Sequence, residues 1–434
     1  MNKRYSRKKM VNLWSDKTKF FNWLKVEFTV MQARIEREEI KAKIPKDLLR
    51  KIIINPDEIH RIEKEVTKHD VIAFLMQVSP QLPEKLQSWF HNKMTSYDPQ
   101  DTGLGITLVE STKIIIDDVK QVMVVMRRIA LEHKYIPMIG RTHGVHAEPI
   151  TFGVKVANWY DEMNRHLLRL KRLKKAVAFG KLSGAVGMYT LDPEIEEIVC
   201  AKLRLKPTIA TQIISRDIVS EYVAVMAIIA GTIGKICTTL RGLARTEIRE
   251  VMEYFDPNQR GSSAMPHKKN PISWENISGI CRDIGSRFMT AFQNQITWDE
   301  RDLANSGSER LILPEVSVYT DYILARFTTS LDKMIIFPDQ MKKNLEITKG
   351  LIFSQDVQSL LARKSGLPRE QAYEIIRQEA LKCWQSNFSF DFYTMLKKNR
   401  TIIEYVSEKE LGECFSLKKK LQHVDYIFKK VFKD

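Results

Sequence analysis

Three segments of the 434-residue chain carry helical periodicity over unusual lengths. Residues 107–133, 153–178 and 215–254 have apolar side chains at every third or fourth position and no proline to end them. A pair of such helices would leave much apolar surface in water, so each must be buried along its length. The pattern predicts an all-α fold with a central bundle of long helices, shared between copies of the chain in an obligate oligomer.

Shorter helical patterns flank these segments. Residues 14–40 read as helix, and Pro56 stands at the start of another, where proline is favoured. Short helical stretches resume after Pro338. We therefore expect three domains: an N-terminal helical domain (1–94), the long-helix bundle (95–340) and a C-terminal helical domain (341–434).

Composition places the chain in a reducing cytoplasm. Its polar start resembles no signal peptide, and the longest uncharged apolar run, residues 222–234, is shorter than the roughly 20 residues that a membrane helix needs. The five cysteines are far apart and fit neither a metal motif nor a disulfide framework. We expect them to be small core residues.

The net charge of +16 has two interpretations. It could mark a nucleic-acid-binding surface. However, the basic residues are scattered along the chain, and no arginine- or glycine-rich arm with interleaved aromatic residues is present. This favours a solvated, lysine-rich exterior that draws anionic small molecules toward a cleft. We expect neither a nucleic acid nor a membrane as a partner.

The densest chemistry lies at residues 261–271, whose sequence is GSSAMPHKKNP. Pro266 and Pro271 exclude a helix there, so the stretch must be a loop. Hydroxyl groups, a lysine and an amide on a mobile loop suit an acidic substrate that loses a proton. A polar connecting loop would explain any one of these residues, but it is a poor explanation for all eleven in this order.

A second cluster covers residues 140–149, GRTHGVHAEP, where His143 and His146 lie in a glycine-broken turn. Histidine is the usual proton carrier near neutral pH. A zinc site is a weaker interpretation, because no third ligand is evident. A structural role remains open for either histidine alone.

Smaller polar groups are explained as well by local structure as by function. Residues 68–70 (KHD) begin a helix that Asp70 is well placed to cap. Residues 91–102 contain hydroxyl and carboxyl groups that a capping turn would explain. Arg301 and Arg310 can bind phosphate or carboxylate through two hydrogen bonds, or form exposed salt bridges.

Residues 261–271 resemble the signature loop of the fumarase/aspartase superfamily, whose members eliminate fumarate from succinyl-type substrates. Within it, the chain resembles the bacterial short-chain adenylosuccinate lyases over nearly its whole length. The resemblance implies a homotetramer with shared active sites and a signature loop over 257–274. It also implies cleavage of adenylosuccinate to AMP and of the succinylcarboxamide ribotide (SAICAR) to AICAR in purine biosynthesis. The matching motifs are residues 4–6 (RYS), 68–74 (KHDVIAF), 140–149, 180–187 (GKLSGAVG), 211–212 (TQ), 262–271 and 275–276 (EN).

The resemblance also assigns roles to residues. Ser262 would be the general base, His143 the general acid, and Glu275 would orient His143. Lys268 and Asn270 would hold the succinyl carboxylates, and His69 would belong to both the catalytic and the nucleotide-binding groups. The other positions that match substrate contacts are Arg4, Tyr5, Lys68, Asp70, His91, Thr95, Ser96, Thr142, Gln212, Ser263, Arg301, Ser306 and Arg310.

The chemistry of elimination agrees with these roles independently. Breaking a C–N bond beta to a carboxylate requires removal of a weakly acidic carbon proton. The resulting dianion needs a cation such as Lys268, and the departing nitrogen needs a proton from a histidine. A serine is a poor base in water, so a closed, cationic loop must activate it. No metal or organic cofactor is needed.

The chain departs from the family pattern at four positions. Lys93 replaces a glycine, Lys68 and Asp356 replace arginines, and Asp299 stands where histidine is common. These changes spare the proton-transfer groups but bear on the phosphate site and on the packing of the C-terminal domain.

Two rival functions stay open at this point. One is another lyase of the superfamily, such as argininosuccinate lyase or a carboxymuconate cycloisomerase, although residues 4–5 and 68–70 favour a nucleotide substrate. The other is a basic helical nucleic-acid-binding protein, which predicts salt-sensitive binding and tolerance of changes at Ser262 and His143.

Overall fold

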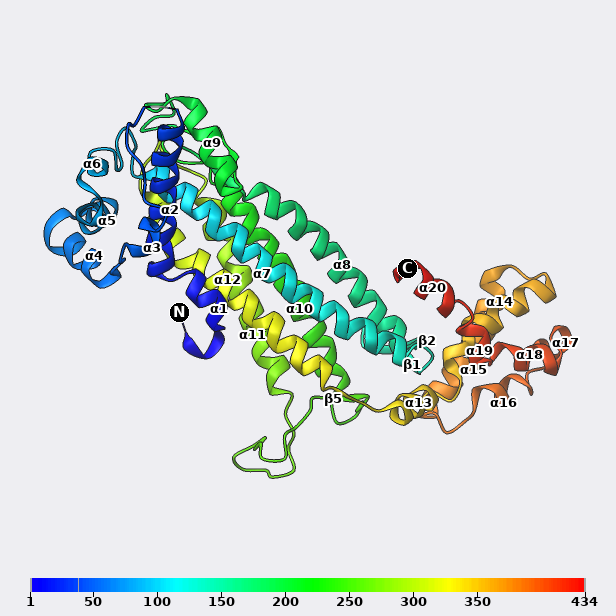
Figure 1. Cartoon of the computed structure of the whole chain (residues 1–434). Helices are drawn as coiled ribbons and strands as arrows, with labels where there is room; N and C mark the ends of the chain where they lie inside the picture. The colour runs from blue at the N-terminus through cyan, green and yellow to red at the C-terminus, as the bar shows by residue number, and fades with distance from the viewer. Residues whose placement is uncertain (1, 38, 433–434) are drawn as a thin grey trace. The chain divides into compact units, whose positions relative to one another are not determined.

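The computed structural model describes residues 2–37 and 39–432 and is predominantly helical, as the periodicity predicts (Figure 1). The contacts within the chain divide it into two compact units. Unit 1 comprises Met1–Gln121, Arg165–Lys235 and Asn276–Phe327, and unit 2 comprises Val122–Asn164, Ile236–Glu275 and Thr328–Asp434. The division into three domains at residues 94 and 340 stays a prediction.

The helices are α1 (Lys8–Leu13), α2 (Asp16–Glu36), α3 (Leu48–Lys51), α4 (Pro56–Ile62), α5 (Asp70–Val78), α6 (Glu84–Gln87), α7 (Tyr97–Glu132), α8 (Phe152–Ala176), α9 (Pro193–Leu203), α10 (Asp217–Leu243), α11 (Ile272–Gln293), α12 (Ala304–Asp332), α13 (Pro338–Glu346), α14 (Ser354–Ser365), α15 (Arg369–Gln385), α16 (Phe392–Leu396), α17 (Arg400–Tyr405), α18 (Glu408–Cys414), α19 (Leu417–Lys420) and α20 (Val424–Val431). Short turns of other helix types are η1 (Lys3–Tyr5), η2 (Glu63–Thr67), η3 (Ser79–Gln81) and η4 (Leu351–Phe353). The strands are β1 (Pro137–Thr142), β2 (Val145–Thr151), β3 (Phe179–Gly180), β4 (Lys206–Pro207), β5 (Val251–Met252) and β6 (Ile335–Ile336), which form three two-stranded sheets.

The predicted long helices exist, but their ends differ. Helix α8 lies close to the predicted 153–178, and Pro56 opens α4 as expected. Helix α7 starts earlier, at Tyr97, because the Asp98 carboxylate accepts the Thr95 N–H and closes its first turn. Helix α10 ends at Leu243 rather than near residue 254.

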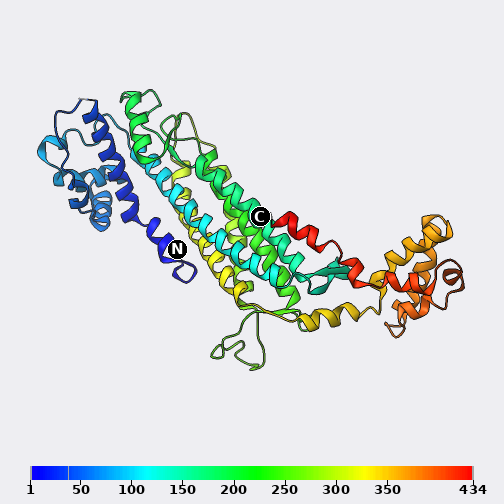
Figure 2. The same ribbon diagram turned by 45° about the vertical axis from the view of Figure 1, so that its right-hand side comes forward.

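Within unit 1, helices α7, α10 and α12 run side by side (Figures 1 and 2). Their packing surfaces share a short chain of buried hydroxyls. The Tyr222 hydroxyl lies 2.6 Å from the Ser111 hydroxyl and 2.7 Å from that of Ser317, which donates to the carbonyl oxygen of Leu313. Burial raises the pKa of Tyr222 to about 12. Each polar atom here has a partner, as a buried position demands.

A buried ionic group joins the same three helices of unit 1. Arg216, just before α10, donates two hydrogen bonds to Asp101 on α7, at 2.9 and 3.0 Å, and one to Glu309 on α12, at 2.9 Å. Burial alone would lower the pKa of Arg216, but the charges of Asp101 and Glu309 raise it. The guanidinium therefore stays charged and fixes the register of the three helices.

By length and composition alone, helix α10 is long and apolar enough to cross a membrane. The uncharged run of residues 222–234, from which the sequence predicted no membrane helix, is only part of it. Half of that apolar stretch is buried inside the protein, and core helices of soluble proteins pass the same test. All five cysteines are buried and free, which confirms the prediction that they are core residues.

Unit 2 has a core of its own among the C-terminal helices, built from residues of α14 to α18. A smaller cluster joins the hairpin β1–β2 to this region through Ile139, Leu345, Ile352 and Phe353. The hairpin that carries residues 140–149 is therefore packed against the helical part that follows α12 in sequence.

Candidate active site

His143 occupies the tip of the β1–β2 hairpin in unit 2, so the glycine-broken turn that the sequence suggested is the turn of a hairpin. Thr142 pairs with Val145, so His143 and Gly144 form a two-residue turn. Both have positive φ, 53° and 81°. Such a turn matches the twist of the strands but strains a residue with a side chain. The imidazole is exposed at the turn, free to meet a substrate or another subunit.

A buried ion pair fixes the hairpin next to this turn. Arg141 donates two hydrogen bonds, at 2.8 and 3.0 Å, to Glu250, which is fully buried. Asn344 donates a further bond of 2.8 Å to the same carboxylate. This contact explains why α10 ends early, because the chain must leave the helix for Glu250 to reach Arg141. Burial and the nearby Arg141 charge lower the pKa of His146, which keeps it neutral.

The signature loop is folded around the Ser262 hydroxyl. Its oxygen accepts hydrogen bonds from the backbone N–H groups of Ala264, at 3.2 Å, and Met265, at 3.0 Å. Donors to an oxygen favour its deprotonated form, so this geometry supplies part of the activation that a serine base requires. Asn270 closes the loop by donating to the carbonyl oxygen of Gly261, at 2.9 Å.

The remaining unit 2 candidates face solvent. Ser263, Lys268 and Glu275 are exposed. Among the described residues of unit 2, no hydrogen bond joins His143 to Glu275 or to Ser262. The predicted orientation of His143 by Glu275 therefore stays a prediction. Within unit 2 of a single chain, these side chains are not joined to one another by hydrogen bonds.

In unit 1 the structure brings several predicted nucleotide-binding residues together. The Ser96 hydroxyl lies 3.3 Å from Nε2 of His69, and Arg310 forms a 2.8 Å ion pair with Asp70. Asp70 stands at the start of α5 as predicted, and its carboxylate accepts the Val71 N–H of the first turn at 2.8 Å, although the N-cap position itself is His69, whose side chain makes no capping bond. Asp70 is the first helical residue, and its second carboxylate oxygen pairs with Arg310.

Arg301 lies at the centre of a second group. Its Nη1 donates to the Gln212 side chain at 2.9 Å, and its guanidinium stacks 3.5 Å from the ring centroid of Tyr97. The hydroxyl of Tyr97 is hydrogen-bonded to Ser306. Nη2 of Arg301 is buried and has no hydrogen-bond partner in the described structure. Nδ1 of His69 makes no hydrogen bond either, but it lies 3.6 Å from an Asp70 carboxylate oxygen. An unpaired buried donor such as that of Arg301 fits an anionic ligand.

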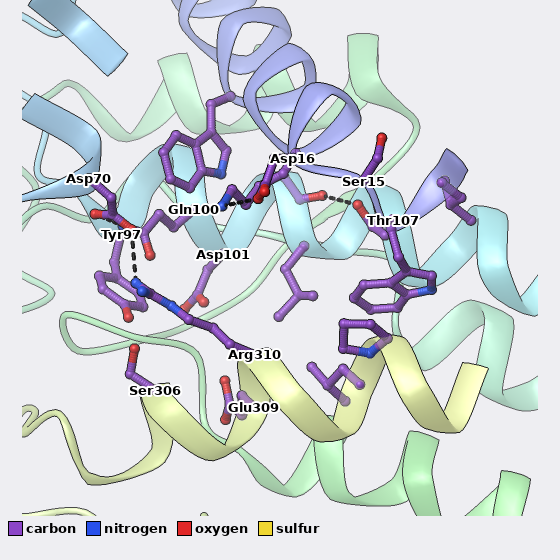
Figure 3. Close-up of a pocket in the computed structure, with 18 of the residues that line it drawn as sticks. Ser15, Asp16, Asp70, Tyr97, Gln100, Asp101, Thr107, Ser306, Glu309 and Arg310 are labelled. Carbon is purple, nitrogen blue, oxygen red and sulfur yellow. Dashed lines mark hydrogen bonds and ion pairs between the residues drawn. The ribbon is translucent and has the colours of Figure 1, made fainter. Parts of the chain in front are cut away.

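A cavity of about 260 Å³ opens beside these residues, lined in part by Asp70, Tyr97, Ser306 and Arg310 (Figure 3). It is smaller than the roughly 300–1,000 Å³ of typical ligand pockets, so it suits part of a nucleotide rather than a whole substrate.

The other candidates of unit 1 have distinct settings. Arg4 is exposed, and Tyr5 accepts a 3.3 Å hydrogen bond from Asn276. Lys68 ends η2 in a left-handed conformation. His91 is held by the buried Glu27, 2.7 Å from its Nδ1. Burial lowers the pKa of His91, but the hydrogen bond and charge of Glu27 outweigh this and raise it, which favours the cationic form.

Two departures from the family pattern find physical explanations. Lys93 is exposed with φ of 61°, the left-handed region that glycine adopts without strain. The turn is therefore kept although the glycine is lost. Asp356 lies 2.8 Å from Lys420, which also lies 2.8 Å from Glu148 on β2. Lys420 supplies a cation beside the position where the family has arginine.

Sequence reasoning missed the residues that hold these groups in place. Tyr97 and Gln100 line the cavity, and Gln100 donates to Asp70 at 3.3 Å. Asp98 and Lys181 form a fully buried ion pair. A lysine inside the motif GKLSGAVG was a usable signal, because the segment is otherwise uncharged.

Comparison with known proteins decides the family. The sequence model of the lyase family matches residues 8–285, and that of the adenylosuccinate lyase C-terminus matches residues 350–431. The adenylosuccinate lyase of Bacillus subtilis (strain 168) is 40% identical over 433 residues, 99% of each chain. That of Staphylococcus saprophyticus is 41% identical over 432 residues, again 99% of each. The chain belongs to the adenylosuccinate lyase family. This family membership confirms the resemblance seen in the sequence and shows that the protein is a lyase.

Solved structures agree at the level of fold. A fumarate lyase from Mesorhizobium sp. BNC1 is similar with a TM-score of 0.88, 24% identity and 99% coverage of both chains. The 3-carboxy-cis,cis-muconate lactonizing enzyme of Pseudomonas putida has a TM-score of 0.86 and 22% identity, covering 98% of this chain and 96% of its own. The fold of the adenylosuccinate lyase family is thus shared with lyases of other substrates, and substrate choice must be argued from side chains.

Proposed function

We propose that this chain eliminates fumarate from adenylosuccinate, leaving AMP, and from SAICAR, leaving AICAR. The observation that carries the proposal is the Ser262 hydroxyl, which accepts two backbone N–H bonds on an exposed loop that also presents Lys268. The named activity of relatives about 40% identical over 99% of the chain supports the same reaction.

In the proposed mechanism, Ser262 takes the proton from the carbon beside a succinyl carboxylate. The electron pair moves onto that carboxylate, and Lys268 and Asn270 stabilise the dianion. The C–N bond then breaks, the double bond of fumarate forms, and His143 gives a proton to the departing nitrogen. Exchange with solvent returns both side chains to their starting protonation, so no cofactor is needed.

The AMP part of the substrate would bind to the unit 1 groups. The unpaired Nη2 of Arg301 supports this assignment, because it is a donor that an anion can satisfy. Arg310 and Ser306 line the adjacent cavity. The further positions proposed to contact substrate are Arg4, Tyr5, Lys68, Asp70, His91, Thr95, Ser96, Thr142, Gln212 and Ser263.

We infer that the working enzyme is a cytoplasmic homotetramer whose active sites combine residues of different subunits. The exposed tip position of His143, without a hydrogen bond to Ser262 or Glu275 in the described part of unit 2, supports this arrangement. A bundle that buries the long helices along their whole length requires further copies of the chain. A division into three domains at residues 94 and 340 belongs to the same proposal.

The decisive experiment measures fumarate released from adenylosuccinate by the purified protein. Ser262→Ala and His143→Ala should each lower turnover by at least about 10²-fold, the usual contribution of a general acid or base. Ser263→Ala is a matched control on the same loop and should mainly raise KM. Near-native turnover in the Ser262 or His143 variant would overturn its assigned role, and no fumarate from the unmodified protein would overturn the function.

A further inference from the structure

Lys181 is a cation with no access to solvent. It lies in the segment after α8, and both it and its partner Asp98 are 0% exposed, with 2.8 Å between the ammonium nitrogen and the carboxylate. Burying such a pair is expensive, and apolar replacements are often equally stable or more so. A contribution to stability therefore does not explain why this ion pair is buried here, and its contacts indicate a different role.

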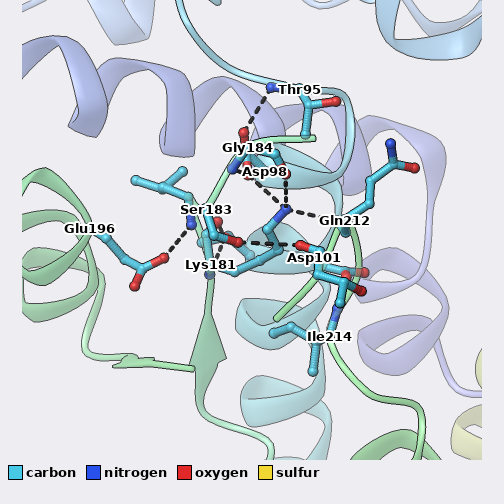
Figure 4. A network of polar contacts seen from close by, with 12 residues as sticks. Thr95, Asp98, Asp101, Lys181, Ser183, Gly184, Glu196, Gln212 and Ile214 are labelled. Carbon is cyan, nitrogen blue, oxygen red and sulfur yellow. Dashed lines mark hydrogen bonds and ion pairs between the residues drawn. The ribbon is translucent and has the colours of Figure 1, made fainter. Parts of the chain in front are cut away.

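Asp98 determines the turn that enters α7. One carboxylate oxygen accepts the Thr95 N–H at 2.8 Å, and the other accepts the Gly184 N–H at 3.3 Å as well as the Lys181 ammonium. The backbone of Thr95, a proposed substrate contact next to Ser96, is thus tied to a buried charge (Figure 4).

Lys181 uses its ammonium group completely. Besides Asp98, it donates to the carbonyl oxygens of Gln212, at 2.7 Å, and Gly184, at 3.2 Å. An ammonium has three donors, so none remains for a substrate. Thr102 on α7 holds the lysine backbone from both sides, accepting its N–H at 3.0 Å and donating to its carbonyl at 2.9 Å.

Gln212, the third segment in this network, links Lys181 to Arg301, one of the proposed nucleotide-binding residues. The Gln212 carbonyl is held by Lys181, and the Gln212 side chain accepts from Arg301 at 2.9 Å. One buried charge therefore joins three chain segments far apart in sequence, at residues 95–98, 180–184 and 212, and the first and third of them carry proposed substrate contacts.

We propose that Lys181 is a positioning residue for the elimination: with Asp98, it sets the places of Thr95, Ser96 and Gln212 against the substrate. It does so without touching the substrate, because its donors are spent and its side chain is buried. This inference rests on the proposed function, since it assigns a role to those three contacts.

The test compares variants of the full-length protein in the fumarate assay. Lys181→Met alone leaves Asp98 as an unpaired buried charge, so this single variant should lose most of its folded protein. The double variant Lys181→Met/Asp98→Asn removes both charges and keeps the shapes. It should fold with a lower melting temperature than the unmodified protein, because the Gln212 and Gly184 carbonyls lose a donor. Measured below that temperature, its kcat/KM should fall by at least about ten-fold, since small misplacements of contacts are costly.

A second readout separates positioning from a general loss of structure. Thr95→Ala should lower kcat/KM in the unmodified protein and have a clearly smaller effect in the double-variant background, because the two changes act on one contact. Lys202→Met is the matched control: it breaks a surface ion pair with Glu36 and should leave kcat and KM unchanged.

The outcomes are distinct. A stable double variant with unchanged kcat/KM, or with a Thr95→Ala effect as large as in the unmodified protein, overturns the positioning role while the proposed function stands. Unmodified protein that releases no fumarate overturns the proposed function and this inference with it.

Discussion

Two buried carboxyl groups that contact Arg7 predict how the stability of the protein changes with pH, and the structure determines the direction of that change. Asp118 on α7 and Asp321 on α12 both accept from the same nitrogen of Arg7, at 2.8 and 2.7 Å. Their other oxygens are buried and have no further partner in the described structure. A proton shared between these two oxygens satisfies both, leaving one negative charge against Arg7.

The surroundings of Asp321 favour its protonated form. Burial and the neighbouring Asp118 raise the pKa of Asp321 from 3.8 to about 8, and Arg7 and Lys9 oppose this only in part. Because the folded-state pKa lies above the unfolded one, the stabilising contribution is complete below about pH 4 and is lost as the pH rises to about 8. Wild-type stability should therefore decline across this range.

Asp321→Asn mimics the protonated acid and removes that decline. At pH 7, which lies about three units above the unfolded-state pKa of 3.8, folding must protonate Asp321 at a cost of about 1.4 kcal/mol per unit. The variant avoids this cost and should be more stable by up to about 4 kcal/mol. At pH 5 the gain should be only about 1–2 kcal/mol. For 434 residues, an unfolding entropy of about 0.9 kcal/mol/K converts these gains to roughly 4 °C and 1–2 °C.

The assay is the thermal midpoint from circular dichroism at pH 5, 6, 7 and 8. The matched control is Asp117→Asn, which changes the neighbour of Asp118 on α7, a side chain that is 66% exposed. Its thermal midpoint should differ little from that of the wild type, by an amount that does not vary with pH. A gain for Asp321→Asn that is equal at all pH values, or a loss at pH 7, would refute the shared proton. The double variant with Asp118→Asn should be less stable than Asp321→Asn, because Arg7 loses its only ionised partner of the pair.

Three further predictions follow from the site. Inactive Ser262→Ala and His143→Ala proteins can be dissociated, mixed and reassembled into verified hybrids. If active sites are shared, the hybrids should regain up to about a quarter of wild-type turnover, since random mixing restores both groups in that fraction of sites. No recovery would refute sharing. Lys93→Gly should raise KM with nearly unchanged kcat, less so at high salt, if the exposed cation attracts substrate; an unchanged KM at low salt would assign Lys93 to solvent. Asp356→Arg should lower stability by about 1 kcal/mol by facing Lys420 with a like charge, and adding Lys420→Gln should restore it; thermal midpoints that do not recover would refute the compensation.

The sequence predicted what depends on local periodicity and motif order. Helix α8 has an uninterrupted pattern, and its bounds agree closely with the expected ones. The end of α10 was wrong because a distant partner, Arg141, draws Glu250 out of the helical pattern. The hairpin strands were missed for a similar reason, since residues 140–149 are rich in glycine and polar groups and lack the alternation of a strand.

The candidate site divides in the same way. Ser262, Lys268 and Asn270 lie within one short loop, so their association could be read from spacing. The pairing of Asp98 with Lys181, 83 positions apart, could not, because burial and charge pairing are properties of the folded chain. Asp70 illustrates the intermediate case: it stands at a helix start and accepts a first-turn N–H as predicted, but the sequence could not show that its second oxygen pairs with Arg310.

The division of contacts between the two units has a consequence for how the protein is made. Unit 1 is assembled from three separate stretches, the last ending at Phe327, and unit 2 begins at Val122. Neither can therefore be completed while only the first part of the chain has left the ribosome. At about 5–20 residues per second, the chain from the end of α2 to Phe327 takes about 15–60 s to make, and that from the end of α10 about 4–17 s, so these helices wait with apolar faces uncovered. Synthesis of this enzyme should depend on chaperones that shield long helices, more than for a protein whose domains follow one another along the chain.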